Sequence, residues 1–411
     1  MEQYNAALKL IKLLNDKGYL AYIVGGYVRD KALNIASNDI DITTNALPEN
    51  LEKDFNLKKT TAGKYLSCVV LFEGFEFELT TFRYDIEYTD HRHPITAVAN
   101  NLEDDLRRRD FTIDALVLDS EERIIDLFGG LDDLNHMRIR TIGNPYKRFD
   151  EDALRILRAC YLASKLNFEI EDETIKGMQA SSKYLPLLST ERIFNEIEKL
   201  LMYANYLKGL LYLKKSFASR YLGFDKTIDL LFNSDLKPTL DDMIIISMYY
   251  NENVEFKLSK AKETLYKKAL ELLNMNLIDN MILYRYRLEE ILLANRLKKY
   301  LHKDFFDEEI ILKKYNILPI KSRKDINIDS QELMNLFNKP QGYWIKETLD
   351  EIENKILTQN LKNDKNEILK FIKEEKHVWY WILYILWENK RNQYIWWNVK
   401  SSCNAKWWFG Y

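Results

Sequence analysis

Two aspartates one residue apart, Asp39 and Asp41, are the side chains of this sequence best suited to metal chemistry. They lie in the run S-N-D-I-D-I-T-T, where charged and apolar residues alternate as in a strand. Residues i and i+2 of a strand point to the same face, so both carboxylates can converge on one point. Mg²⁺ prefers oxygen ligands, and two such ions can activate an attacking hydroxyl and stabilise a leaving pyrophosphate. The spacing therefore predicts a magnesium site, the alternative being an ordinary pair of surface carboxylates.

A glycine pair lies upstream of these aspartates, in I-V-G-G-Y-V-R-D. Gly25 and Gly26 follow an apolar run, residues 19–24, that is typical of a buried strand, and they open a predicted helix. Free backbone N–H groups at a helix start can hold phosphate, and Arg29 can add a charge-assisted contact. The alternative is an ordinary strand–helix turn. The motif GxxxxGK[ST] is absent from the sequence, which argues against a P-loop ATPase.

A third carboxylate would complete the metal site. Residues 67–82 are predicted to form two strands joined around Glu73 and Gly74. Glu78 lies on the second of these strands, and Glu76 shares its face because the side-chain period of a strand is two. The spacing alone does not separate the two glutamates.

Glu151, Asp152, Arg155 and Arg158 recur at intervals of three and four residues, which on one helix gives them a common face. One interpretation is a set of surface ion pairs. Another is base selection, because cytosine and adenine both present an exocyclic amine beside an acceptor nitrogen. A carboxylate that accepts from the amine and an arginine that donates to the ring nitrogen would admit only C and A. Uracil and guanine would leave buried charges unpaired.

The elements that must position these residues change in character along the chain. Up to about residue 140, strand and helix signals are mixed, with further strands predicted at 112–118 and 123–128. Beyond the turn at 143–145, apolar residues recur at helical spacing. The 411 residues include only 7 Pro and 13 Gly, which suits long helical stretches. We therefore expect an α+β head followed by a helical remainder.

The composition limits the class of protein. A formal net charge of −3 means that any RNA contact must come from local basic patches. Three widely spaced cysteines exclude a disulfide framework and a CxxC metal site, and they predict a reducing, cytoplasmic setting. The most apolar late stretch, 378–387, is about half of the roughly 20 residues that a membrane span needs, so no membrane partner is expected. The sequence gives no oligomeric state.

Several motifs, in a fixed order, resemble those of class II tRNA nucleotidyltransferases, the family of CCA-adding enzymes with bacterial poly(A) polymerases as close relatives. The opening runs A-Y-I-V-G-G-Y-V-R-D and D-I-D-I-T-T-N-A-L-P-E carry the first part of the resemblance. Further matches are R-R-D-F-T-I-D-A (108–115), D-L-F-G-G-L-D-D-L (126–134), I-R-T-I-G-N-P (139–145), E-D-A-L-R-I-L-R (151–158), E-R-I-F-N-E (191–196) and E-L-M-N-L-F-N-K-P-Q-G-Y-W-I (332–345).

The resemblance implies an enzyme that adds C, C and A to the 3′ end of tRNA from CTP and ATP without a nucleic-acid template. It implies a polymerase-β-like head, a small mixed sheet with helices, followed by an all-helical neck, body and tail. The implied segments are head 1–140, neck 141–205 with the base-selecting helix, body 206–325 and RNA-binding tail 326–376. Residues 377–411, which hold most of the tryptophans, have no counterpart in the family and stay unassigned.

The resemblance also assigns roles to residues. Asp39 and Asp41 would be the metal ligands, with Glu78 rather than Glu76 as the third catalytic carboxylate. Two groups of residues would bind the nucleotide. The triphosphate and the ribose would be bound by Gly26, Arg29, Arg109 and Asp110. The base would be bound by Asp152 and Arg155, with Arg158 nearby. Asp110 would serve the ribose hydroxyls.

Three features bear on how much of CCA is added. Residues 87–94 correspond to the family's flexible loop, and their presence favours full CCA synthesis. Tyr161 stands where many relatives have an arginine of the nucleotide pocket, and Asp114 where the family usually has asparagine. The competing functions are an A-adding, CC-adding or poly(A) polymerase of the same family, and a non-catalytic RNA-binding protein.

Overall fold

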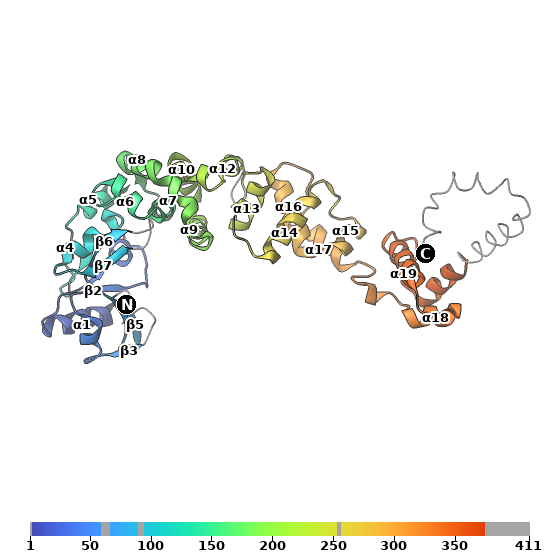
Figure 1. Ribbon diagram of the computed structural model, residues 1–411, viewed down its shortest axis with the longest axis horizontal. Coiled ribbons are helices and arrows are strands. Elements are labelled where there is room, and N and C mark those ends of the chain that lie inside the picture. The colour runs from blue at the N-terminus through green and yellow to red at the C-terminus, as the bar shows by residue number, and fades with distance from the viewer. Residues whose placement is uncertain (1, 59–65, 89–93, 253–255, 375–411) are drawn as a thin grey trace, which may run out of the picture. The chain divides into compact units, whose positions relative to one another are not determined.

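The chain divides into two compact units, one ending at residue 258 and the other beginning at 259 (Figure 1). The computed structural model describes residues 2–58, 66–88, 94–252 and 256–374. Within these ranges the first unit combines strands with helices, and the second contains helices alone. The finer boundaries at 140, 205 and 325 remain predictions.

A seven-stranded mixed sheet lies in the first unit, in the order β3-β4-β5-β2-β1-β8-β9. Neighbouring strands are antiparallel, except that β2 and β5 run parallel. The sheet strands are β1 Ala21–Val24, β2 Asp41–Thr44, β3 Asn56–Lys58, β4 Ser67–Phe72, β5 Phe75–Thr81, β8 Val117–Leu118 and β9 Ile124–Ile125. Two further pairs join β6 Arg83–Tyr88 to β7 Pro94–Val98, and β10 Arg138–Ile139 to β11 Glu169–Ile170. This arrangement confirms the predicted mixed-sheet head.

The hairpin predicted over 67–82 is confirmed. Strands β4 and β5 pair from Ser67 with Thr80 to Phe72 with Phe75. Glu73 and Gly74 connect them with φ angles of 47° and 84°. A two-residue connection with both φ positive matches the right-handed twist of the flanking strands, which explains the tight turn.

The strand predicted at 112–118 is wrong in its first half. Thr112–Asp114 form the short 3₁₀ helix η2, and only the last two residues enter the sheet as β8. The N–H of Thr112 donates to the carbonyl of Arg140 at 3.0 Å, so this part is tied to the segment before the neck and not to a strand of the sheet. The strand predicted at 123–128 is likewise shortened to β9.

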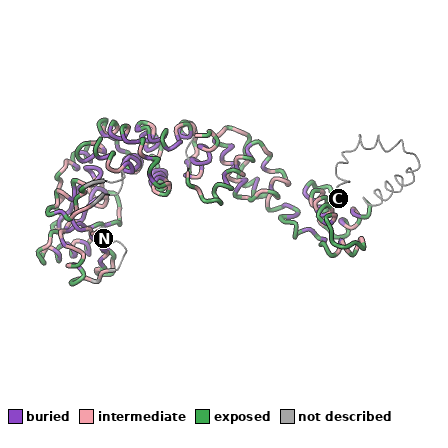
Figure 2. The backbone as a smooth tube through the Cα atoms, viewed as in Figure 1, coloured by how far each residue is buried: buried purple, intermediate pink, exposed green. Residues whose placement is uncertain are grey.

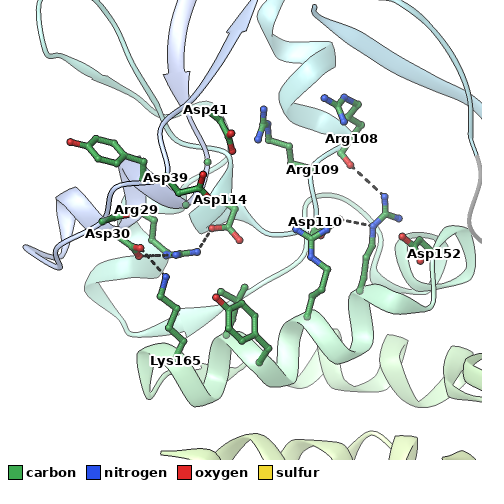
Figure 3. A pocket seen from close by; sticks show the side chains of 18 of the residues that line it. Arg29, Asp30, Asp39, Asp41, Arg108, Arg109, Asp110, Asp114, Asp152 and Lys165 are labelled. Atoms are coloured by element: carbon green, nitrogen blue, oxygen red, sulfur yellow. Dashed lines mark hydrogen bonds and ion pairs between the residues drawn. The ribbon is translucent and has the colours of Figure 1, made fainter. Parts of the chain in front are cut away.

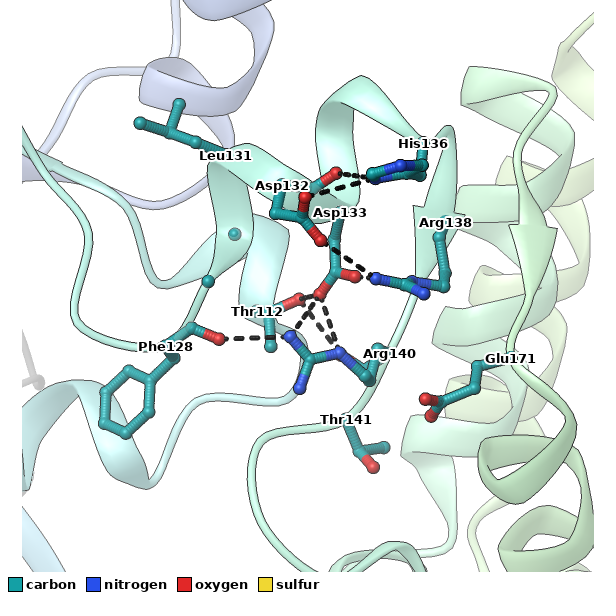
Figure 4. Close-up of polar contacts among 12 residues, drawn as sticks. Thr112, Phe128, Leu131, Asp132, Asp133, His136, Arg138, Arg140, Thr141 and Glu171 are labelled. Carbon is teal, nitrogen blue, oxygen red and sulfur yellow. Dashed lines mark hydrogen bonds and ion pairs between the residues drawn. The ribbon is translucent and has the colours of Figure 1, made fainter.

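Asp133 lies fully buried in helix α5 (Gly130–Asn135) and holds η2 against the segment 138–140. Its carboxylate accepts from Thr112 Oγ1 at 2.6 Å, from Arg138 Nε at 2.6 Å and from Arg140 Nε at 2.9 Å (Figure 4). Burial raises the pKa of Asp133, but the hydrogen bonds from Thr112, Arg140 and Arg138 outweigh it, so the pKa lies below its usual range. The carboxylate thus ties η2 and β10 to α5.

Helices cover the sheet and build the rest of the first unit. Helix α1 packs on β1 through an apolar stripe that includes Ala7, Leu10 and Leu14. The other helices of this unit are α2 Gly26–Ala32, α3 Pro48–Leu51, α4 Leu102–Arg107, α6 Pro145–Glu151, α7 Leu154–Leu166, α8 Asp172–Ser181, α9 Thr190–Met202, α10 Tyr206–Lys215, α11 Ala218–Tyr221, α12 Asp225–Phe232 and α13 Leu240–Tyr249, with α1 at Glu2–Asp16 and the 3₁₀ helix η3 at Ser182–Leu187.

The second unit consists of short helices around its own apolar cores (Figure 2). One core gathers Leu333, Ile352, Ile356 and Ile368, all nearly or fully buried. The helices are α14 Lys260–Glu271, α15 Asn280–Arg285, α16 Leu288–Tyr300, α17 Glu308–Asn316, α18 Ser330–Phe337 and α19 Tyr343–Leu357, with η4 Leu272–Asn274, η5 Arg323–Asp325 and a further helical stretch at 365–374. The predicted helical remainder is therefore confirmed for the described residues.

Candidate active site

A polar pocket of about 480 Å³ opens in the first unit, between the start of α2, the start of β2, the segment after α4 and one face of α7 (Figure 3). Most of the residues that line it are charged. The predicted site residues that line it are Gly25, Gly26, Arg29, Asp39, Asp41, Arg109, Asp110, Asp152, Arg155 and Arg158. Of the predicted site residues, only Glu78 is outside this lining.

The two aspartates of the predicted metal site flank a buried residue. Ile40 between them is 5% exposed, whereas Asp39 and Asp41 are exposed, so both carboxylates lie on the open side. The parallel pairing of β2 with β5 sets Asp41 opposite Glu78, and Glu76 pairs with Leu71 on the other strand. Glu78, and not Glu76, is thus the neighbour of Asp41.

The electrostatics of this corner favour a cation. Burial of the carboxylate and the charges of Asp39 and Glu78 raise the pKa of Asp41 to about 6, against the opposite effect of Arg109. Clustered carboxylate oxygens of this kind suit a hard divalent ion. Within the described ranges, no group of three or more His, Cys, Asp or Glu side chains has the geometry to hold a metal. The pair Asp39 and Asp41 therefore remains the predicted ligand set.

The glycine turn leads directly into a network of buried charges. Gly25 has φ +79°, and a Cβ there would lie 3.4 Å from one terminal nitrogen of Arg109, so glycine suits both the backbone and the space. Arg29 is 4% exposed; it donates to Asp30 Oδ1 at 2.8 Å and pairs with Asp114. Lys165 of α7 reaches the other oxygen of Asp30 at 2.8 Å. Arg29 is thus held between two carboxylates in the wall of the pocket.

Asp110 is also paired, with arginines of the neck. Arg155 Nε donates to Asp110 Oδ1 at 2.7 Å, and Arg158 lies 2.6 Å from Oδ2. Burial raises the pKa of Asp110, but Arg158 and Arg155 outweigh it and lower the pKa to about 2. Arg148 of α6 adds a third connection by donating to the carbonyl of Arg109 at 2.7 Å. Segment 108–110 is therefore bound to α6 and α7 through charged hydrogen bonds.

The prediction that Glu151, Asp152, Arg155 and Arg158 share one helix is wrong. Helix α6 ends at Glu151 and α7 begins at Leu154, and Asp152 between them is extended, with φ −146° and ψ 104°. The Asp152 carboxylate accepts from the N–H of Leu154 at 2.9 Å. Short acidic side chains compete in this way with helical hydrogen bonding and favour helix starts. Arg155 still bonds to Glu151 at 3.1 Å, and all four residues still lie at or beside the pocket.

Comparisons with known proteins give this pocket a family. The chain is 32% identical to the CCA-adding enzyme of Staphylococcus epidermidis over 397 residues, which cover 92% of this chain and 99% of that protein. It is 35% identical to the CCA-adding enzyme of Bacillus licheniformis over 391 residues, covering 89% and 97%. The chain belongs to the class II CCA-adding enzymes. It is accordingly a tRNA nucleotidyltransferase by family.

The structural and domain comparisons agree with this membership. The crystal structure of the Bacillus stearothermophilus CCA-adding enzyme in complex with CTP matches 92% of this chain and 98% of its own, at 28% identity and a TM-score of 0.74. The family description "Poly A polymerase head domain" matches residues 21–140, "Probable RNA and SrmB-binding site of polymerase A" matches 167–222, and "tRNA nucleotidyltransferase domain 2 putative" matches 254–372. The predicted polymerase-like head followed by helices is thus the fold of CCA-adding enzymes.

Sequence reasoning missed several residues of this CCA-adding enzyme's pocket: Asp30, Arg83, Asp85, Arg108, Tyr161 and Lys165 also line it. For Lys165 a signal was available, because positions 155, 158, 162 and 165 continue one face of α7. Tyr161 also lies three residues after Arg158 on α7, whereas for Asp30, Arg83, Asp85 and Arg108 no helical spacing points to the pocket. Tyr161, noted as a departure from the family, contacts Tyr203 with ring centroids 5.9 Å apart.

Two further findings concern the predictions of partners and of the loop. In the part of the chain that the structure describes, no helix is both long enough and apolar enough to cross a bilayer. The loop predicted at 87–94 falls mostly on residues 89–93, which lie outside the described residues, as does the segment 377–411.

Proposed function

We propose that this chain adds C, C and A in turn to the 3′ end of tRNA, using CTP and ATP and releasing pyrophosphate. The observation that carries the proposal is the pair Asp39 and Asp41 beside Glu78 at a charged pocket. The match to CCA-adding enzymes over nine-tenths of the chain supports the same reaction. The crystal structure of one such relative is a complex with CTP, which favours CTP as one substrate.

The carboxylates are proposed to organise the metal chemistry. Asp39 and Asp41 would hold Mg²⁺, and Glu78 would add a third oxygen donor next to Asp41. When bound there, two such ions activate the 3′-hydroxyl of the RNA and stabilise the leaving pyrophosphate. The raised pKa of Asp41 supports this role, because three crowded carboxylates are stabilised by a cation.

The nucleotide is proposed to lie between the glycine turn and α7. Gly25 and Gly26 leave the backbone open to a phosphate, and Arg29 and Arg109 flank that turn. Asp110 would accept from the ribose hydroxyls. Of its two arginine partners, Arg158 is 49% exposed and Arg155 only 4%, so Arg158 is the one that can give way to a ribose.

Base choice is proposed to rest on Asp152 with the arginines of α7. Burial raises the pKa of Asp152, and Arg155 opposes that shift, so the carboxylate lies within the field of the guanidinium. Asp152 would accept from the exocyclic amine of C or A, while Arg155, with Arg158 nearby, would donate to the ring nitrogen. Uracil and guanine would place a carbonyl against the carboxylate.

The test is nucleotide incorporation on three tRNA transcripts, ending before CCA, after the first C, and after CC. The purified chain receives Mg²⁺ with each NTP singly and with all together. We expect addition of C, C and A followed by a stop. Addition of A alone or of CC alone would favour one of the partial enzymes, and long A tails on a generic RNA would favour a poly(A) polymerase.

The competing non-catalytic hypothesis predicts tRNA binding without incorporation on any transcript. The complete carboxylate set argues against it, because an RNA-binding protein needs no such pair. We keep the cytoplasm as the expected setting, since Cys68 and Cys160 are buried free thiols.

A further inference from the structure

A fully buried carboxylate, Asp105 of α4, lies under the pocket and collects several donors. Arg108 donates to its Oδ1 twice, from Nε at 3.0 Å and from a terminal nitrogen at 2.8 Å. Arg109 donates to Oδ2 at 3.4 Å, and Thr43 Oγ1 donates to the same oxygen at 3.1 Å. The backbone N–H of Arg83 donates to Oδ1 at 3.3 Å. One carboxylate therefore fixes the segments that carry three arginines.

The guanidinium groups of this cluster lie close enough to affect one another's pKa. Burial lowers the pKa of Arg83, and the charges of Arg108 and Arg109 lower it further, although Asp85 and Asp105 oppose them. Burial and Arg108 likewise lower the pKa of Arg109. The Nε of Arg109 is buried without a hydrogen-bond acceptor. Guanidinium groups stay protonated in proteins, so these cations repel one another and a further anion beside them would stabilise the cluster.

The cluster faces the part of the pocket where phosphates are expected. Arg83, Arg108 and Arg109 all line the pocket. Arg109 lies beside the Gly25 turn, and its charge is close enough to Asp41 to oppose the rise in the pKa of that carboxyl. Arg83 begins β6, two residues after the end of the strand that carries Glu78. Figure 3 shows Arg108 and Arg109 on the same side of the pocket as Asp41.

We propose that Arg83 and Arg108 join Arg109 as a phosphate-binding cluster, and that Asp105 is the positioning residue that orders it. The ligand is a phosphate of the reacting molecules, either in the polyphosphate of the incoming nucleotide or in the last phosphodiester of the tRNA. Arginine forks suit both, because their paired N–H groups match phosphate oxygens. The inference rests on the proposed function but can be tested without turnover.

The experiment compares Arg83→Gln, Arg108→Gln and Asp105→Asn with a neighbouring control, Arg107→Gln. Arg107 is 60% exposed, pairs with Glu103 and does not line the pocket. Equilibrium binding of inorganic pyrophosphate and of CTP is measured by calorimetry, and KM for CTP, KM for tRNA and kcat are measured separately. Thermal melting shows which variants fold, and Arg108→Lys, which keeps the charge, replaces Arg108→Gln if that variant does not fold.

We expect Arg83→Gln and Arg108→Gln to weaken pyrophosphate binding about tenfold or more, with kcat less affected and Arg107→Gln unchanged. Asp105→Asn should weaken it as well, because the arginines lose their common anchor. A tenfold rise in KM for tRNA with unchanged pyrophosphate binding would also support the cluster and assign it to the RNA phosphate. Unchanged binding and KM for both ligands in folded variants would overturn the proposal. Because pyrophosphate binding needs no nucleotide addition, failure of the proposed function would be seen separately.

Discussion

At the scale of single residues, Asp41, which we propose as a metal ligand, shows how a crowded carboxylate can lower the stability of the fold. Its pKa of about 6 lies above the value of about 3.9 expected for an unfolded aspartate. A folded-state pKa above the unfolded one means that the protonated carboxyl favours folding. This contribution is lost as the pH rises through about 6, so at pH 7 the ionised side chain opposes folding when no cation is bound.

Asp41→Asn should therefore raise the free energy of unfolding at pH 7 in EDTA. The gain is at most about 1 kcal/mol, because the residue as a whole is exposed and solvent screens the repulsion. The same variant should lose nucleotide incorporation and any stabilisation by Mg²⁺. Urea unfolding in EDTA and in Mg²⁺ measures the change in stability and the stabilisation by Mg²⁺, and the incorporation assay measures activity. Glu76→Gln is the matched control and should change neither; a less stable Asp41→Asn in EDTA would contradict the account.

Asp152→Asn tests base selection without removing the hydrogen bond at the start of α7. The amide oxygen can still accept from the N–H of Leu154, so the melting temperature should change little. The amide nitrogen can donate to a carbonyl, which the carboxylate cannot. We expect the preference for CTP over UTP to fall by about ten- to a hundredfold, from a loss of roughly 1.5–3 kcal/mol. Ratios of kcat/KM measure this, and an unchanged ratio would remove Asp152 from base choice.

At the scale of elements, α7 connects the pocket to the head through charges spaced along one face. Arg155 and Arg158 bind Asp110, and Lys165 binds Asp30. The cluster of Lys165, Asp30, Arg29 and Asp114 contains two cations and two anions, so it is neutral as a whole. Removing one member leaves a buried charge without its full set of partners.

Lys165→Met should accordingly lower the free energy of unfolding by about 1.5–3 kcal/mol, since Asp30 is 4% exposed and loses one of its two cations. Asp30 is then held by Arg29 alone, so the side chain of Arg29 is less firmly positioned, and KM for CTP and ATP should rise several-fold. Lys165→Arg should restore both. Lys176→Met removes an ion pair whose side chains are 57% and 58% exposed, and it should cost less than about 1 kcal/mol. Equal decreases in the free energy of unfolding for Lys165→Met and Lys176→Met would contradict a structural role for the cluster of Lys165, Asp30, Arg29 and Asp114.

At the scale of the whole molecule, acid should act most strongly on the first unit, which carries several buried carboxylates of lowered pKa, whereas Glu290 is the buried carboxylate of lowered pKa among the described residues of the second unit. Asp105, Asp110 and Asp133 all lie there, and arginines hold the pKa of each below its usual range after outweighing the effect of burial. A depressed folded-state pKa gives stability that is present above about pH 3.9 and lost as the pH falls towards the folded value, about 2 for Asp110.

We expect the urea concentration at the midpoint of unfolding, followed by far-ultraviolet circular dichroism, to fall between pH 5 and pH 3. Asp110→Asn should be less stable at pH 7 and should show a shallower acid dependence, because it has no carboxylate to protonate. Trp344 is the tryptophan that lies within the described residues, in α19 of the second unit, so the fluorescence of a variant that keeps Trp344 as its one tryptophan reports on that unit. A fluorescence transition that moved with pH as strongly as the dichroism would contradict an origin in the first unit.

The sequence by itself determined what depends on local period and order. Turn chemistry predicted the hairpin at Glu73 and Gly74. Alternation predicted a strand through Asp39 and Asp41, and both are exposed on either side of the buried Ile40, but β2 begins only at Asp41. The order of the motifs indicated the family and, with it, the fold. These features follow from neighbours within a few residues, whose geometry is set by the backbone.

Only the tertiary structure decided which side chains meet. Parallel pairing of β2 with β5 placed Glu78 beside Asp41, a choice that the period of two could not make. The break at Asp152 arose because its side chain accepts the N–H of Leu154, which helical spacing does not reveal. The cluster at Asp105 joins a strand start to a helix end 22 residues away. Contacts of this kind depend on how elements dock, and no local repeat encodes that.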